Sequence, residues 1–129
     1  MIVIDTHVWL WWMSSPERLS NDAREAIAAA PAIGVSTISA WEVAMLAARG
    51  RISLDRDARD WVRRAFAEHR VEPLAPSVDV ALDAGALDER AFPGDPADRF
   101  IYATARSVEA PLVTRDARIR AFAPSATIW

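Results

Sequence analysis

The chain has 129 residues, of which 52% are hydrophobic and 26% charged, and its formal net charge is −3. This length buries a hydrophobic core without disulfides, and the composition is that of one globular domain spanning residues 1–129. The absence of cysteine excludes disulfides, iron–sulfur clusters and thiolate zinc sites, and the negative net charge argues against a generally basic surface that coats nucleic acid.

Strand and helix patterns alternate along the chain. Residues 1–5 form an apolar run rich in β-branched side chains, which predicts a buried strand, and residues 32–38 predict a second one. Further short strands are expected at 71–74, 111–114 and 127–129. Helices are expected at 6–13, 20–30, 39–49, from 55 or 57 to about 69, 77–87, 97–108 and 117–122. This alternation predicts an α/β fold, a central parallel sheet of four to five short strands flanked by helices.

The sequence contains no candidate for a membrane span. The first apolar run is interrupted at Asp5 and His7, and no basic segment precedes it, so it is a poor signal peptide. No other segment reaches the roughly 18 uninterrupted apolar residues that a span requires. We therefore expect a cytoplasmic protein.

Four acidic residues occupy positions that this fold would bring together. Asp5 and Asp116 lie at or just beyond the ends of predicted strands. Glu42 and Asp98 lie in the first turns of helices that would begin at the same edge of the sheet. Ligands of open parallel sheets bind at this edge, outside the carboxyl ends of the strands.

Each of the four also has an ordinary structural explanation. Asp5 and Asp116 could cap the helices that follow them. The segment Ser39-Ala-Trp-Glu42 has the spacing of a capping box, in which Ser39 would be the cap. The segment Asp95-Pro-Ala-Asp98 is a strong helix start, and its second acid could simply complement the helix dipole. Taken singly, capping explains these residues well, but four caps have no reason to converge.

Convergence of the four carboxylates would have a chemical consequence. Like charges close together raise one another's pKa values unless a cation neutralises them. An all-oxygen site without cysteine suits a hard cation, Mg²⁺ or Mn²⁺. Such a site can activate water and stabilise in-line displacement at phosphorus, with one metal or with two. The residues therefore favour metal-assisted phosphodiester cleavage.

Four short motifs also occur in the order of a known family. They are Asp-Thr-His at 5–7 within the opening DTHVWLWW, Ser-Ala-Trp-Glu at 39–42, Asp-Pro-Ala-Asp-Arg at 95–99 and Thr-Arg-Asp at 114–116. Together, over essentially the whole chain, they resemble the PIN-domain ribonucleases, and specifically the VapC toxins of bacterial type II toxin–antitoxin systems. One departure is Gly94, where relatives often carry His.

The resemblance implies an activity, a cofactor and partners. It implies an endoribonuclease that depends on Mg²⁺ or Mn²⁺, is commonly a homodimer and is silenced by a small VapB-like antitoxin. It places the catalytic and metal-binding site on Asp5, Glu42, Asp98 and Asp116.

Neighbours of these acids have two explanations each. Thr6 and Thr114 could orient a carboxylate or bind a metal-bound water, or they could hydrogen-bond the local backbone. Arg99 and Arg115 could contact RNA phosphate, or they could form ion pairs.

Six tryptophans are more than one small domain usually buries, and aromatic residues are enriched at interfaces. We therefore predict that part of the segment containing Trp9, Trp11, Trp12 and Met13 lines a partner surface, with core packing as the default for the other rings.

Two other functions are compatible with the sequence. One is a non-catalytic module that uses the acidic pocket for metal-stabilised folding. The other is a phosphatase or phospho-acceptor domain that would use Asp5 covalently. Phosphatases of that kind usually have a second Asp two residues on, where this chain has His7, and a phosphate-binding lysine, which it lacks. Alternation along the strand would in any case point His7 away from Asp5.

Overall fold

The computed structural model describes residues 1–92 and 94–129 and contains one five-stranded sheet. Its strands are β1 (Ile2–Ile4), β2 (Ile33–Ser36), β3 (Val71–Leu74), β4 (Leu112–Val113) and β5 (Thr127–Ile128). All pairs are parallel and the spatial order is β3-β2-β1-β4-β5, so β1 lies at the centre. The predicted α/β class and parallel sheet are confirmed.

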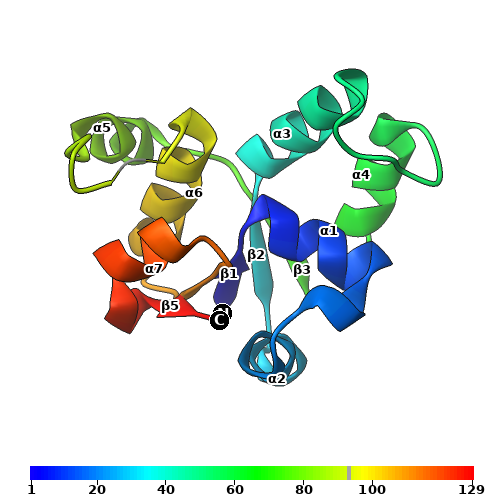
Figure 1. Ribbon diagram of the computed structural model, residues 1–129, viewed down its shortest axis with the longest axis horizontal. Coiled ribbons are helices and arrows are strands. Elements are labelled where there is room, and N and C mark those ends of the chain that lie inside the picture. Colours follow the sequence, from blue (N-terminus) through cyan, green and yellow to red (C-terminus); the bar gives the residue numbers. More distant parts are fainter. Residues whose placement is uncertain (93) are drawn as a thin grey trace.

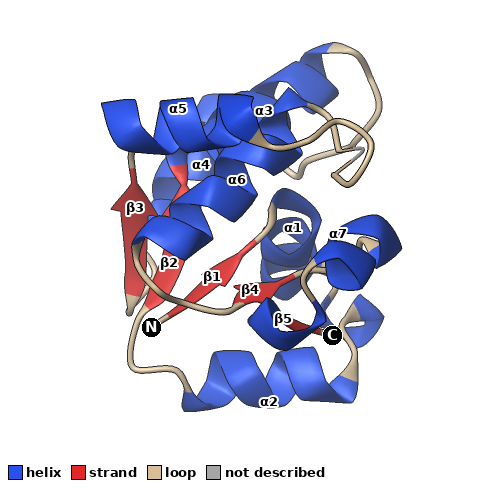
Figure 2. Ribbon diagram, turned by 90° about the vertical axis from the view of Figure 1, so that its left-hand side faces the viewer, coloured by secondary structure: helices blue, strands red, loops and turns tan. Residues whose placement is uncertain are grey.

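Seven α-helices flank the sheet within the described residues. They are α1 (Thr6–Ser14), α2 (Asn21–Ala29), α3 (Thr37–Ala48), α4 (Ala58–Phe66), α5 (Val78–Ala86), α6 (Pro96–Ser107) and α7 (Ala117–Phe122), with short 3₁₀ turns η1 (Pro16–Arg18) and η2 (Pro124–Ala126). The strands rise toward the side that carries α3 and α5, whereas α2 lies at the opposite end (Figure 2). None of the described helices is both long and apolar enough to cross a membrane.

The side chains of β1 divide the core into two halves. Ile2 and Ile4 belong to the half formed with α1, α2 and α4, and Val3 belongs to the half formed with α6 and α7. Figure 1 shows these two groups of helices on opposite sides of the central strands. Because both faces of β1 are covered, its sequence is a continuous apolar run up to Asp5.

The start of α3 differs from the prediction. The helix begins at Thr37, because Ser36 is its cap and the Ser36 hydroxyl accepts a hydrogen bond from the Ile38 amide at 3.2 Å. Ser39 therefore lies inside the first turn, where its buried hydroxyl is hydrogen-bonded to the Thr6 hydroxyl at 3.0 Å. The predicted Ser39 cap, and with it the capping-box explanation of Glu42, is wrong.

The tryptophans are also distributed differently from the prediction. Trp9 is fully buried against two other aromatic rings, and Trp11 is 7% exposed. Trp12 and Met13 are half-buried and pack against the same core. Trp9 and Trp11 are therefore core residues, and the predicted partner surface is left to Trp12 and Met13 as a prediction. The most exposed of the six tryptophans is Trp41, at 56%.

Candidate active site

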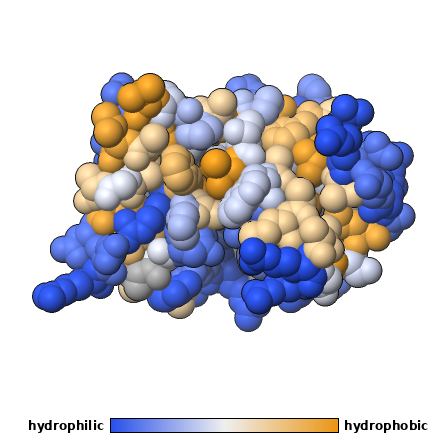
Figure 3. Space-filling view, turned by 90° about the horizontal axis from the view of Figure 1, so that it is seen from above, coloured by the Kyte–Doolittle hydropathy of each residue, from blue (hydrophilic) through white to orange (hydrophobic). Residues whose placement is uncertain are grey.

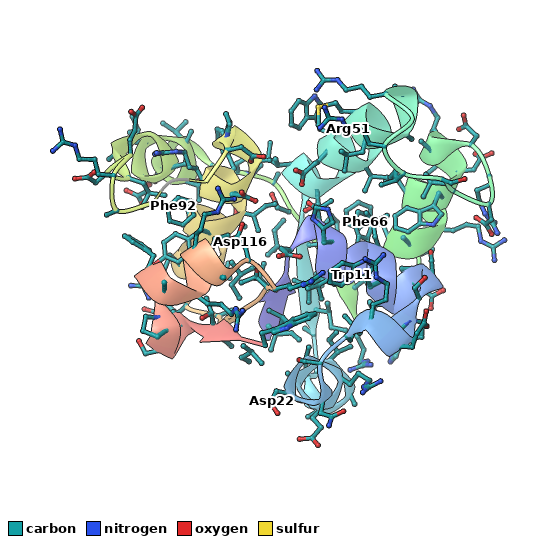
Figure 4. All side chains as sticks on the ribbon, viewed as in Figure 1. Trp11, Asp22, Arg51, Phe66, Phe92 and Asp116 are labelled. Carbon is teal, nitrogen blue, oxygen red and sulfur yellow. The ribbon has the colours of Figure 1, made fainter. Side chains whose placement is uncertain are left out.

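The carboxyl ends of β1 and β4, together with residues of α1, α3, α6 and α7, line a cleft of about 610 Å³. The four carboxylates identified from the sequence all line it, and Asp95 lines it too. In Figure 4, Asp116 from the start of α7 and Trp11 from α1 lie on two sides of this cleft. Five acidic side chains thus share one cavity at the edge where parallel sheets bind their ligands.

Asp5 is both a helix cap and a cleft residue. Its carboxylate accepts a hydrogen bond from the Val8 amide at 2.8 Å, which caps α1. Burial raises the pKa of the Asp5 carboxyl group above its usual value, while hydrogen bonds with Thr114 and Val8 act in the opposite direction. The capping explanation is therefore correct, and Asp5 also lines the cleft.

Glu42 points into the cleft from α3. Its side chain is 7% exposed, and burial raises the pKa of its carboxyl group. A hydrogen bond with Thr6 lowers that pKa, whereas the charges of Asp95 and Asp5 raise it further. Thr6 is itself fixed by its hydrogen bond to Ser39, so a buried pair of hydroxyl groups supports this carboxylate.

Asp98 has a strongly raised pKa. It lies in the first turn of α6, where its backbone amide donates to the capping Asp95 side chain at 3.0 Å. Burial, followed by the charges of Asp95, Glu42, Asp116 and Asp5, raises the pKa of Asp98 to about 7. A group of this kind is half protonated near neutral pH unless a cation is nearby.

Asp116 has the opposite environment. Its carboxylate caps α7 through the amides of Arg118 and Ile119, at 2.8 Å and 3.4 Å. It also forms an ion pair with the Arg118 guanidinium at 3.0 Å, and hydrogen bonding from Arg118 lowers its pKa. Asp116 is therefore ionised at neutral pH. Its amide donates to the buried Thr114 hydroxyl at 3.0 Å, which fixes the loop that carries it.

The donor chemistry of the cleft fits a hard divalent cation. The candidate ligands are carboxylate oxygens, and burial disfavours the charged forms of Asp5, Glu42 and Asp98. Within residues 1–92 and 94–129, however, no group of three or more acidic, His or Cys side chains could hold an ion as it stands. Repulsion between the carboxylates and the ion pair of Asp116 with Arg118 oppose closer approach. To hold a metal, these carboxylates would have to draw together.

The structure adds residues that the sequence analysis did not place at the site. His7 lines the cleft, contrary to the expectation that it points away from Asp5. The expectation was wrong because residues two apart in a strand point to the same face, and because Thr6 begins a helix that places His7 in its first turn. Positive charge on His7 would favour the ionised forms of Asp5 and Glu42. A first-turn position in a helix that begins at this edge is the signal that could have identified it.

The two arginines proposed for RNA contact have different environments. The Arg99 guanidinium donates to the carbonyl groups of Ala84, Leu87 and Phe92, at 3.4, 2.7 and 3.1 Å. These three hydrogen bonds join α6 to the end of α5 and to the following loop. Because they use the guanidinium of Arg99, they do not support RNA contact by this residue. Arg115, in contrast, is exposed and lines the cleft.

Comparison with known proteins agrees with this geometry. The PIN domain family, represented by its sequence model, matches residues 2–123. The chain is 45% identical over 120 residues to Ribonuclease VapC22 of Mycobacterium tuberculosis, covering 92% of this chain and 89% of that protein.

Solved structures share the fold at lower identity. A toxin–antitoxin complex from Klebsiella pneumoniae superposes with a TM-score of 0.70 at 22% identity, covering 100% of this chain and 97% of the other. The sarcin-ricin-loop-cleaving toxin VapC20 of Mycobacterium tuberculosis gives 0.69 at 19% identity, covering 94% of each chain.

Proposed function

The chain belongs to the PIN domain family, and we propose that it is a metal-dependent endoribonuclease that acts as the toxin of a type II toxin–antitoxin system. The observation that carries the proposal is the convergence of four carboxylates from four separate segments on one cleft. The name of the 45% identical relative, Ribonuclease VapC22, supports RNA as the substrate. Metal dependence rests on the chemistry of the carboxylates in this chain.

Mg²⁺ or Mn²⁺ would be held by the four carboxylates Asp5, Glu42, Asp98 and Asp116. When bound, such an ion lowers the pKa of water and offsets charge that develops on the phosphate. Burial destabilises the ionised forms of Asp98 and Glu42, so a bound cation would stabilise both carboxylates. Thr6 and Thr114 orient Glu42 and Asp5 through hydrogen bonds, which prepares both groups for the metal.

The same proposal includes a protein partner and a location. Several solved structures with this fold are toxin–antitoxin complexes, among them VapBC-1 of nontypeable Haemophilus influenzae. We therefore assign a small VapB-like antitoxin as the partner that silences the nuclease. An enzyme that acts on cellular RNA under the control of such a partner belongs in the cytoplasm.

The proposed oligomer is a homodimer. Helix α5 exposes two apolar side chains one turn apart, Val78 at 77% and Leu82 at 66%, and an apolar patch lies over α5 at the left of Figure 3. Neighbouring apolar residues this exposed are typical of association surfaces. We expect Leu82→Glu to convert a dimer to a monomer in sedimentation equilibrium. A parent chain that sediments as a monomer at the same concentration would contradict the homodimer.

The experiment that tests the function is RNA cleavage. The purified chain is incubated with total RNA in Mg²⁺ or in EDTA, and the new RNA ends are mapped. We expect cleavage only with metal, and its loss in Asp5→Asn, because asparagine can still accept the capping hydrogen bond from Val8 but carries no charge. Asp22→Asn is the matched control, since Asp22 lies on α2, far from the cleft (Figure 4).

Two results would reject the assignment. One is cleavage by Asp5→Asn at the parental rate. The other is metal-dependent thermal stabilisation of the parent without cleavage of any RNA in a broad panel, which is the behaviour of a non-catalytic module.

A further inference from the structure

Two arginines lie on the ring of a single tryptophan at the rim of the acidic cleft. The guanidinium carbon of Arg18 is 4.5 Å from the centroid of the Trp11 ring, and that of Arg115 is 5.5 Å from it. Arg18 belongs to η1 and Arg115 to the segment between β4 and α7, so the two are distant in sequence. All three side chains line the same cleft as the carboxylates.

Arg18 and Arg115 do not pair with the carboxylates of the cleft within the described part of the chain. Five carboxylates line the cleft, yet within the described part of the chain neither Arg18 nor Arg115 forms an ion pair or a side-chain hydrogen bond. Arg118, in the same cleft, shows the alternative, because it pairs with Asp116 at 3.0 Å. Contact with a ring uses the flat face of a guanidinium and leaves its N–H groups available to an anion.

The ring that holds them is fixed in place. Trp11 is 7% exposed, and its ring lies 5.9 Å from the rings of both His7 and Trp129, measured between centroids. An indole packed in this way cannot turn aside, so it restricts where the two guanidinium groups can lie. Preorganisation of this kind reduces the entropy that the arginines would lose on binding a ligand.

We propose that Arg18 and Arg115, held on the Trp11 ring, form a clamp for the phosphate groups of the RNA strand beside the scissile bond. The proposal rests on the ribonuclease function and extends it by naming residues that bind the substrate. An RNA strand that approaches five carboxylates is repelled, and cations placed at the rim offset that repulsion. The planar guanidinium fork matches the oxygens of a phosphodiester.

The direct test is RNA binding in an Asp98→Asn background, in which the strand is not cut. A short fluorescein-labelled single-stranded RNA is titrated by anisotropy at several salt concentrations in Mg²⁺. We expect Arg18→Gln and Arg115→Gln each to weaken binding by roughly tenfold, since each removes a charge-assisted contact. Each should also reduce the slope of log affinity against log salt by about 0.7. The matched control is Arg59→Gln, an exposed arginine of α4 outside the cleft, which should change neither quantity.

Two further variants separate the clamp from simple charge. Arg115→Lys keeps the charge but loses the flat guanidinium, so we expect it to restore the salt slope without restoring full affinity. Trp11→Phe keeps an aromatic ring and every charge, and should weaken RNA binding with an unchanged slope. In the otherwise unaltered enzyme, the clamp variants should raise KM and leave kcat nearly unchanged.

The clamp is overturned if Arg18→Gln and Arg115→Gln bind RNA with the parental affinity and salt slope, or if Arg59→Gln loses as much as they do. Failure of the ribonuclease function has a different signature, because the parent chain itself would then not cut RNA in Mg²⁺.

Discussion

Asp98 shows how burial and neighbouring carboxylates act on an acidic side chain of the cleft. Burial and neighbouring carboxylates raise its pKa from 3.8 to about 7. Because the folded-state pKa lies above the unfolded value, folding binds a proton more tightly. The stability that this proton contributes is fully present below the unfolded pKa and is lost as the pH rises through the folded pKa. Above that pH, the ionised group opposes folding until a cation neutralises it.

We therefore expect Asp98→Asn to be more stable than the parent at about pH 8 in EDTA. The full shift corresponds to about 4 kcal/mol, and screening of the partly exposed side chain reduces this to roughly 2 kcal/mol. Urea unfolding over a pH series measures the difference between the two proteins, which should shrink toward acidic pH. Mg²⁺ should stabilise the parent more than the variant. Equal pH dependence in both proteins would contradict this account of the cleft.

The acidic residues could be identified from the sequence, but the sequence could not show whether each is a helix cap, a cleft residue or both. Asp5 and Asp116 were each explained as helix caps, and each is one. A cap uses one side of the carboxylate to accept backbone amides, which leaves the group available to the cleft. His7, Arg18 and Trp11 were not predicted at the site, because their positions depend on where a helix begins and on contacts between distant segments.

At the scale of elements, Arg99 joins two helices. Its guanidinium on α6 donates to carbonyl groups at the end of α5 and in the following loop. Hydrogen bonds from a charged group to otherwise unpaired carbonyls stabilise more than neutral ones. We expect Arg99→Gln to lower the free energy of unfolding by about 2 kcal/mol and to leave KM for RNA unchanged.

Urea unfolding and initial-rate kinetics below the unfolding temperature measure the two effects separately. Arg59→Gln again serves as the control, because its side chain is exposed on α4 and should affect neither. A rise in KM without loss of stability would restore RNA contact as the role of Arg99.

The boundary between β2 and α3 shows why the ends of helices and strands were harder to predict than their existence. Thr37 and Ile38 are β-branched, so local propensity extends the strand to residue 38. Both Ser36 and Ser39 are acceptable caps from sequence alone. The burial of Ser39 against Thr6 distinguishes them, and this contact joins residues 33 positions apart.

At the scale of the whole molecule, the hydrophobic pattern of the sequence was sufficient to predict the strands of the sheet. It was not sufficient to predict which tryptophans are buried. β1 and β2 are buried on both faces, and their continuous apolar runs identified them. Composition counted the aromatic rings but carried no information on their positions. It therefore favoured the segment of Trp9, which the core encloses, over the isolated Trp41, which is the most exposed of the six.

The arrangement of the core predicts that the chain unfolds as one unit. Val3 and Ile4 are adjacent in β1 but belong to opposite halves of the core, so exposing either half disrupts the strand that supports the other. The buried tryptophans all lie in the half that contains Ile4. Tryptophan fluorescence therefore reports unfolding of that half, whereas far-UV circular dichroism reports helices on both sides of the sheet.

The half that contains Val3 needs a reporter of its own. Because the chain has no cysteine, Ala105→Cys on α6 places a single buried thiol there, and its reaction with a thiol reagent reports exposure of that half. We expect fluorescence, circular dichroism and thiol reactivity to give one urea midpoint, as two-state unfolding of a single domain requires. A thiol that becomes reactive at lower urea than the fluorescence change would show that α6 and α7 unfold separately. Asp98 and Asp116 would then leave the cleft while Asp5 and Glu42 stayed in place, and the carboxylate cluster would depend on the weaker half of the core.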